Sequence, residues 1–188
     1  MKRALTAASA ALALTALAAC TGSPDAEGTA TDSGDPTWSV PCDPASTPIE
    51  GVGELELGCL GDDAEVSVGA SDKPLVVVLW ASWCVPCREE APEVEAFYQA
   101  YGDQVDVLGV DTADTREAAR WFAEDFGMTF PSVSDPDEAI RIGLGIPALP
   151  GIAFVNPDGT VAELIAEPGV TTESIAATAE SAFGLELS

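Results

Sequence analysis

Two cysteines separated by two residues, Cys84 and Cys87, carry the clearest chemical signal in the sequence. Their spacing lets the two sulfurs meet across the first turn of a helix, and such a pair between a strand and a helix is typical of a redox site. At a helix N-terminus Cys84 would lie beside unpaired backbone N–H groups, which favour its thiolate. Pro86 can start the helix without losing a hydrogen bond. We therefore expect Cys84 to be the exposed attacking thiolate and Cys87 the shielded resolving thiol.

Two other uses of this pair remain open but fit the sequence less well. A zinc site needs four ligands, and the chain has no histidine, while Cys42 and Cys59 are not spaced as a second ligand pair. A purely structural disulfide is the other alternative. A two-residue gap at a strand-to-helix junction makes a strained and more oxidising bridge than structural disulfides usually are.

The composition excludes several further kinds of chemistry. The 188 residues include 32 acidic and 7 basic side chains, which give a formal charge of −25. This charge argues against a nucleic-acid partner, because such binding relies on Lys and Arg to neutralise phosphates. Without histidine there is no Ser-His-Asp or Cys-His machinery and no imidazole metal site. We expect no metal and no cofactor beyond the redox-active disulfide itself.

Residues 1–19 have the features of an export signal. Lys2 and Arg3 precede an apolar run that is too short for a comfortable membrane span. The run ends Leu17-Ala18-Ala19-Cys20, which resembles the lipobox of bacterial lipoproteins, where the cysteine is diacylated and becomes the first residue. The alternative is an ordinary secretory signal with Cys20 incidental. Either signal exports the protein, so disulfides are permitted, and lipid on Cys20 would anchor it to the outer face of the cytoplasmic membrane.

Residues 20–48 have the composition of a flexible tether between this anchor and a folded domain. They are rich in Gly, Pro, Ser, Thr and Asp, and the large apolar residues Trp38 and Val40 do not recur with any period. Such a segment cannot bury enough surface to offset its ordering entropy. An arm that binds a partner is the alternative. The remaining residues, 49–188, are enough for one domain with one core.

Hydrophobic patterning in residues 49–188 predicts an α/β domain. The run at 75–80 is apolar throughout, as in a strand buried on both faces, and the turn at 156–159 marks a β-hairpin. We expect strands at 64–68, 75–80, 105–110, 152–155 and 161–165, and helices at 88–101, 114–126, from 135 or 137 to 142, and from 171 or 172 to about 184. This order predicts a mixed sheet with helices on both faces.

The stretch Val76–Pro92, which contains the redox pair, closely resembles the TlpA/ResA branch of extracytoplasmic thioredoxin-like proteins. The likeness continues in order through Val107–Asp111, Phe130–Val133, Ile146–Pro150 and Asn156–Gly159, and it spans about residues 50–183. It implies a thioredoxin-like three-layer sandwich, with a mixed central sheet and helices on both faces. It also implies a thiol-disulfide oxidoreductase whose partners are protein thiols and disulfides.

The resemblance assigns a substrate-binding role to a proline far along the chain. Pro150 matches the proline whose preceding peptide bond is cis in thioredoxin folds, and X–Pro bonds are where cis peptides occur. In the family the backbone of the preceding residue, here Leu149, pairs with a substrate peptide. The alternative is that Pro147 or Pro150 simply shapes a surface turn.

Residues beside the redox pair receive roles from the same resemblance. Trp83 matches the family aromatic that shields the disulfide and offers an apolar docking edge, and Val85 and Pro86 complete the expected substrate-binding surface. Glu90 matches a family glutamate that influences thiol titration. There it would raise the thiol pKa and relay a proton to or from Cys87. A solvated charge on the helix face is the alternative for Glu90.

Cys42 and Cys59 bracket the junction between tether and domain. Of the five cysteines, one is assigned to lipidation and two to the redox site, and these two are left. In an exported chain they are expected to form a structural disulfide that links the N-terminal extension to the domain. A regulatory or second redox pair is the alternative.

The sequence and the resemblance together predict a lipid-anchored thiol-disulfide oxidoreductase, with a membrane thiol reductant or oxidant as electron partner. The family favours reduction, for example of apocytochrome c or of a copper-site assembly protein. A disulfide-forming oxidase and a non-catalytic binding lipoprotein with an inert disulfide remain alternatives. A copper chaperone of this fold would need Cys-x-x-x-Cys and a distal histidine, which this chain lacks.

Overall fold

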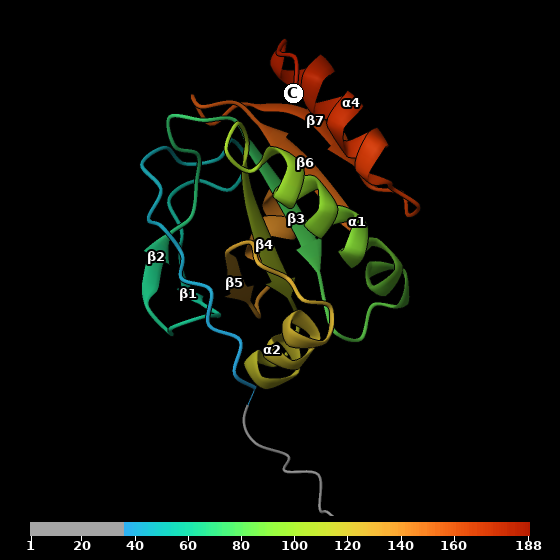
Figure 1. Cartoon of the computed structure of the whole chain (residues 1–188). Coiled ribbons are helices and arrows are strands. Elements are labelled where there is room, and N and C mark those ends of the chain that lie inside the picture. The colour runs from blue at the N-terminus through green and yellow to red at the C-terminus, as the bar shows by residue number, and fades with distance from the viewer. Residues whose placement is uncertain (1–35) are drawn as a thin grey trace, which may run out of the picture. The chain divides into compact units, whose positions relative to one another are not determined.

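The computed structural model describes residues 36–188, and within this part seven strands form one mixed sheet in the order β2-β1-β5-β4-β3-β6-β7 (Figure 1). Along the chain the strands are β1 (Glu56–Cys59), β2 (Glu65–Ser67), β3 (Leu75–Trp80), β4 (Asp106–Thr112), β5 (Ser132–Asp135), β6 (Gly151–Val155) and β7 (Val161–Ile165). The central strands β3, β4 and β5 are parallel, and the outer strands pair antiparallel with their neighbours. The predicted mixed sheet is confirmed.

Helices cover both faces of this sheet, which makes three layers. They are α1 (Val85–Tyr101), α2 (Arg116–Asp125), α3 (Ala139–Gly143) and α4 (Thr172–Phe183). Residues of α1, α2 and α4 pack into one hydrophobic cluster, and α3 packs into a second cluster on the other face. Figure 1 shows α1 and α4 lying over β3 and β6. The expected thioredoxin-like α/β sandwich is confirmed.

Strand β3 leads directly into the redox pair, and its burial follows from its sequence. All six residues are buried. Val76, Val78 and Trp80 belong to the cluster under α1, whereas Leu75, Val77 and Leu79 belong to the opposite one. An uninterrupted apolar strand is what a central parallel position requires, because both faces are covered.

Helix α1 begins three residues earlier than the predicted start at Arg88. Cys84 is its N-cap, with extended backbone angles and a side chain that accepts a hydrogen bond from the Cys87 amide, and Pro86 stands in the first turn. Proline at this place forfeits no intrahelical bond, because the first N–H groups of a helix have no partner within it. The redox pair therefore lies within the first turn of the helix.

The folded unit also begins earlier than the boundary predicted at residue 49. Residues 36–48, assigned to the tether, lie against the domain: Trp38 Nε1 donates to the Met128 carbonyl at 2.6 Å, and the Ala45 amide donates to the Ser67 carbonyl at 3.0 Å. A disulfide joins Cys42 to Cys59. The predicted signal peptide at 1–19, the predicted lipidation site Cys20 and the rest of the predicted tether lie outside the described residues.

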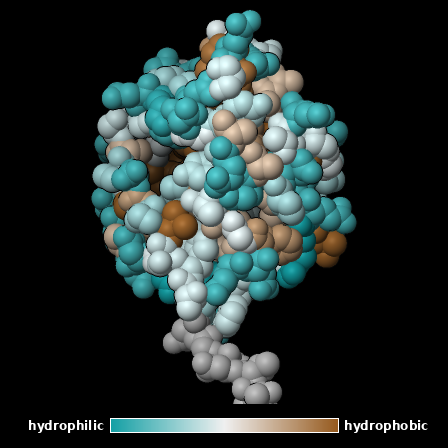
Figure 2. All heavy atoms as spheres, in the orientation of Figure 1, coloured by the Kyte–Doolittle hydropathy of each residue, from teal (hydrophilic) through white to brown (hydrophobic). Residues whose placement is uncertain are grey.

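The surface of the described part fits the acidic composition. On the face seen in Figure 2, hydrophilic residues predominate, and hydrophobic side chains appear in small, separate groups. Among residues 36–188, none of the helices combines the length and the apolar character that crossing a bilayer requires.

Candidate active site

Cys84 and Cys87 form a disulfide at the junction of β3 and α1. The Cys84 amide donates to the Ala81 carbonyl at 3.1 Å, which closes the turn after β3, and the Cys87 amide donates to Cys84 Sγ at 3.3 Å. The Cys84 sulfur therefore already accepts a backbone N–H at the positive end of the helix. That donor would stabilise a thiolate at Cys84 once the bond is reduced.

The expected difference in exposure between the two cysteines is not seen in this disulfide form. Cys84 is 4% and Cys87 3% exposed, and both pack in the hydrophobic cluster beneath α1. Bonded to each other, the two sulfurs share one apolar site, so neither stands out into solvent. The exposed residues here are their neighbours, Trp83 at 58% and Val85 at 67%.

The loop between β4 and α2 supports the active-site loop, which the sequence did not indicate. Trp83 Nε1 donates to the Ala113 carbonyl at 3.1 Å, and Asp114 Oδ2 accepts from the Ser82 amide at 2.6 Å. Ala113 has a φ of 52°, an uncommon value for a residue with a Cβ. Arg88 Nη2 donates to the Ser82 carbonyl at 2.6 Å. The backbone N–H and C=O groups of Ser82, two residues before Cys84, are therefore both held by side chains.

Glu90 is buried, so the reading as a solvated charge is wrong. The residue is 5% exposed, and its Oε1 accepts from the amides of Gly169, at 2.6 Å, and Val170, at 3.4 Å. Burial raises the pKa of Glu90 above its ordinary value; the two amides act in the opposite direction, and the charge of Glu89 adds to the increase. A carboxyl with a raised pKa can hold or release a proton closer to neutral pH.

The peptide bond between Leu149 and Pro150 is cis, and Pro150 is buried. Pro150, Cys87 and Glu90 line one small pocket of about 20 Å³, which has room for about one water molecule. Pro147, the alternative proline, is exposed. The fold thus brings together residues from α1 and from the segment before β6 that are distant in the sequence.

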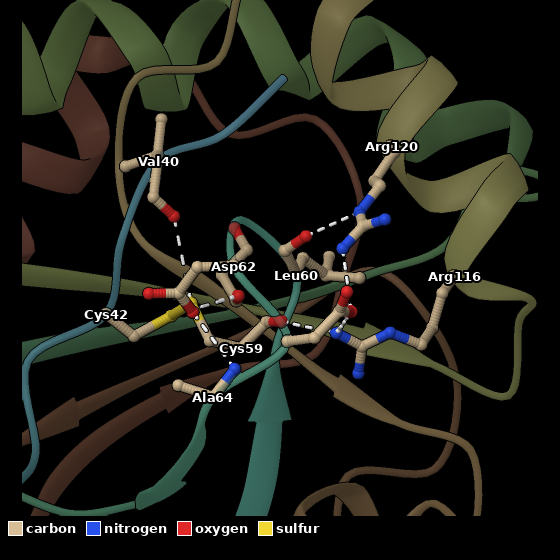
Figure 3. The surroundings of a disulfide bond; sticks show 10 residues. Val40, Cys42, Cys59, Leu60, Asp62, Ala64, Arg116 and Arg120 are labelled. Atoms are coloured by element: carbon tan, nitrogen blue, oxygen red, sulfur yellow. Dashed lines mark hydrogen bonds and ion pairs between the residues drawn. A yellow bond between two sulfur atoms is a disulfide. The ribbon is translucent and has the colours of Figure 1, made fainter. Parts of the chain in front are cut away.

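The second disulfide joins Cys42 to the last residue of β1, next to two arginines of α2 (Figure 3). Arg116 donates to the Cys59 carbonyl, and Arg120 Nε donates to the Leu60 carbonyl at 2.6 Å. Both guanidinium groups also pair with Asp63. Burial alone would raise the pKa of Asp63, but the two arginines outweigh this effect and lower it. The disulfide links the N-terminal segment to the end of β1, and the two arginines link the end of β1 to α2.

The chain belongs to the Redoxin family, whose model matches residues 36–179. It is similar to the thiol-disulfide oxidoreductase ResA of Bacillus subtilis, with 29% identity over 104 residues, covering 55% of this chain and 57% of ResA. It is also similar to the thiol:disulfide interchange protein HelX of Rhodobacter capsulatus, with 31% identity over 107 residues, 56% of this chain and 57% of HelX. The predicted likeness to ResA-type proteins is confirmed, although the chain spans only a little over half the length of these relatives.

A comparison with solved structures also finds proteins of similar fold. The structure of MTB dsbF in its mixed oxidised and reduced forms superposes with a TM-score of 0.63 and 23% identity. The match covers 71% of this chain and 98% of that one. At this identity the likeness concerns the fold, and it supports the thioredoxin-like architecture.

Proposed function

We propose that the protein is a thiol-disulfide oxidoreductase that exchanges the Cys84–Cys87 pair with protein thiols and disulfides. The observation that carries the proposal is the disulfide in the first turn of α1, whose second cysteine, Cys87, lines one small pocket together with the buried Glu90 and with Pro150. Relatives that are named for this activity match a little over half of the chain, and the Redoxin family model covers the pair itself.

The reduced pair would act in two steps. The Cys84 thiolate attacks a substrate disulfide, forms a mixed disulfide and releases one substrate thiolate, which takes up a proton. Cys87 then gives its proton to Glu90 and attacks Cys84 Sγ. This closes the Cys84–Cys87 bond and releases the second substrate thiolate. Two electrons have passed to the substrate, and an electron partner must return them through a further thiol exchange.

The exposed residues around the pair support an apolar docking surface for the substrate chain. Trp83 and Val85 are the exposed hydrophobic residues next to the disulfide, and the Trp83 ring is fixed through its Nε1. In this proposal Pro86 shapes the same edge, and the backbone of Leu149 beside Pro150 pairs with an extended substrate segment. Trp83→Ala should raise KM for a protein disulfide while leaving exchange with a small disulfide unchanged.

We propose reduction as the physiological direction, of the kind used in cytochrome c or copper-site assembly. The measurement that decides the direction is the reduction potential of the pair against glutathione. A value below about −250 mV is expected for a reductant, and a value near −120 mV would instead fit a disulfide-forming oxidase.

Catalysis itself is tested with insulin reduction. Cys84→Ser should abolish the activity, and Cys42→Ala/Cys59→Ala, which leaves the working pair intact, should retain it. If the Cys84 variant reduced insulin as fast as the wild type, the Cys84–Cys87 bond would be inert and the protein a binding module.

We further propose that the protein is exported and anchored by lipid on Cys20 to the outer face of the cytoplasmic membrane. The support is the sequence Leu17-Ala18-Ala19-Cys20 behind a short basic and apolar leader. Labelled fatty acid should appear on the wild type in cells, and Cys20→Ala should remove the label. Labelling that persists in the variant would contradict the anchor.

A further inference from the structure

A buried carboxyl that the mechanism above does not use lies at the end of β4, on the strand next to β3. Asp111 is 0% exposed. It pairs in register with Trp80 on β3 and with Ser134 on β5. Within residues 36–188, neither of its carboxyl oxygens has a hydrogen-bond partner at ordinary distance and angle, although the Ser134 side chain lies close enough to lower the pKa of Asp111.

Other polar atoms without partners lie on the same three strands. They are Trp80 Nε1 and Ser132 Oγ, and with the oxygens of Asp111 they are the buried side-chain N and O atoms that lack a partner in the described residues. A Cβ built on Gly109 would lie 2.8 Å from Trp80 Nε1 and 2.2 Å from Ser132 Oγ, so both atoms border one backbone position, two residues before Asp111. Because an unpartnered buried polar group is costly, their concentration at one place points to a role other than stability.

The charged groups around Asp111 come from several elements. Asp114 in the following loop and Asp135 at the end of β5 add negative charge, and Arg116 at the start of α2 adds positive charge. The charge of Arg116 is shared between Asp111 and Asp63, because Arg116 also forms an ion pair with Asp63 in the turn between β1 and β2. Burial, and next the charge of Asp114, raise the pKa of Asp111 to about 8, so its carboxyl is mostly neutral at pH 7.

Asp111 is also connected to the redox pair through the structure. The loop at 112–115 holds the active-site loop by the two hydrogen bonds described above. Trp80, the register partner of Asp111, lines the small pocket together with Cys87 and Glu90. A change of charge at Asp111 therefore occurs opposite the last residue of the strand that leads to the sulfurs, in a part of the protein from which solvent is excluded.

We propose that Asp111 is a positioning residue for the disulfide exchange: its neutral carboxyl supports the reduced site, and its ionised carboxylate opposes formation of the Cys84 thiolate. The inference rests on the proposed function, since it concerns the same pair. In this proposal the protonation state of the buried Asp111 carboxyl is linked to the redox state of the Cys84–Cys87 pair.

The linkage follows from the balance of protons. When a substrate dithiol reduces the pair, two electrons break the Sγ–Sγ bond, the dithiol loses two protons, and Cys87 takes one of them. Cys84 remains a thiolate. If Asp111 is already neutral, the second proton goes to solvent. If Asp111 is ionised, the new thiolate repels it, and the second proton goes to Asp111 instead.

The test compares the redox equilibrium of the wild type and of Asp111→Asn with glutathione from about pH 6 to about pH 9.5. The titration of glutathione cancels in the ratio of the two equilibrium constants. The ratio should be constant up to about pH 7, and reduction of the wild type should then become less favourable than that of the variant, by on the order of tenfold at high pH. A tenfold change is about 1.4 kcal/mol, the order of size expected for two unit charges that interact inside a protein. Asp137→Asn, an exposed acid near the same end of the sheet, is the matched control and should give a constant ratio throughout.

A second measurement does not depend on catalysis or on the variant folding. Infrared spectra of the wild type, and of Glu90→Gln, which lacks the other buried carboxyl with a raised pKa, should both contain the band of a protonated buried carboxyl that disappears near pH 8 in the disulfide form and at higher pH after reduction by a phosphine. A constant ratio for Asp111→Asn overturns the inference, as does the absence of this band at pH 7 or its indifference to reduction. If the wild type fails to exchange with glutathione, the proposed function fails, and the infrared titration still decides the role of Asp111.

Discussion

Replacement of both Cys42 and Cys59 by alanine removes the cross-link between the N-terminal segment and β1. The bond joins residues 17 positions apart, and closing a loop of that size restricts the unfolded chain by about 3 kcal/mol in the chain-entropy model. For a domain of this size, such a loss lowers the melting temperature by about 6–12 °C.

The structure indicates that the variant still folds, so the loss can be measured. Trp38 keeps its hydrogen bond to the Met128 carbonyl, and Arg120 keeps its hydrogen bond to the Leu60 carbonyl. These contacts lie on either side of the bond and involve neither sulfur. The expected change is therefore in the free energy of unfolding, with the native fold retained.

Thermal unfolding followed by circular dichroism gives the size of the effect. A matched protein, Cys84→Ser/Cys87→Ser, keeps only the Cys42–Cys59 bond among residues 36–188, and a reductant should lower its melting temperature by the same amount. Adding the two alanine substitutions to that protein should remove its response to reductant. A double alanine variant that melts within about 2 °C of the wild type would refute the reasoning, because the loop entropy would then be offset in the native state.

Three further substitutions test single contacts. Glu90→Gln removes the buried carboxyl beside Cys87 and should slow insulin reduction by about 100-fold or more, with loss of one pKa from the pH–rate profile. Asp111→Asn should flatten the pH dependence of stability measured by urea unfolding. The pKa of Asp111 is raised from 3.8 to about 8 on folding. Its contribution to the free energy of unfolding is therefore fully present below pH 3.8 and is lost as the pH rises to about 8, at up to about 1.4 kcal/mol per pH unit. Equal slopes in variant and wild type would contradict this. Gly109→Ala places a Cβ 2.2 Å from Ser132 Oγ and should cost about 1–3 kcal/mol in thermal unfolding, and an unchanged melting temperature would show that β5 can move aside.

The parts of the fold that could be predicted are those with an uninterrupted local signal. Strand β3 is apolar along its whole length, so its limits at Leu75 and Trp80 were predicted correctly. The helix of the redox pair was also predicted, with the pair in its first turn, but the run of helix formers indicated a start at Arg88 and not at Val85. Its start depends on the Cys84 side chain as N-cap, a role in which cysteine is not among the preferred residues.

Strands β1 and β5 were missed because their burial comes from partners far away in the sequence. In β5 only Val133 is apolar, although all four residues are buried. In β1, Gly58 lowers the strand propensity, and the reason for glycine is distant: a Cβ there would lie 2.4 Å from Arg116 Nη1 on α2.

The site could be predicted where spacing alone defines it and could not where burial does. Two cysteines with two residues between them indicate a redox site from the sequence alone. Whether Glu90 is buried or solvated depends on the Gly169 amide, which is 79 residues away. Asp111 stood inside a stretch that carried the family likeness, but its special environment arises from Asp114, Asp135 and burial between β3 and β5.

The position of β1 also has a consequence for the order in which the chain can assemble. Apart from β2, the sheet neighbour of β1 is β5, whose residues follow some seventy positions later. In the proposed export, the chain reaches the oxidising side of the membrane from its N-terminus, so β1 must wait there without its long-range partner until β5 has arrived. Cys42 needs only Cys59, and the covalent loop can therefore close on the early part of the chain. It would present β1 and β2 as a preassembled edge to which the later strands add.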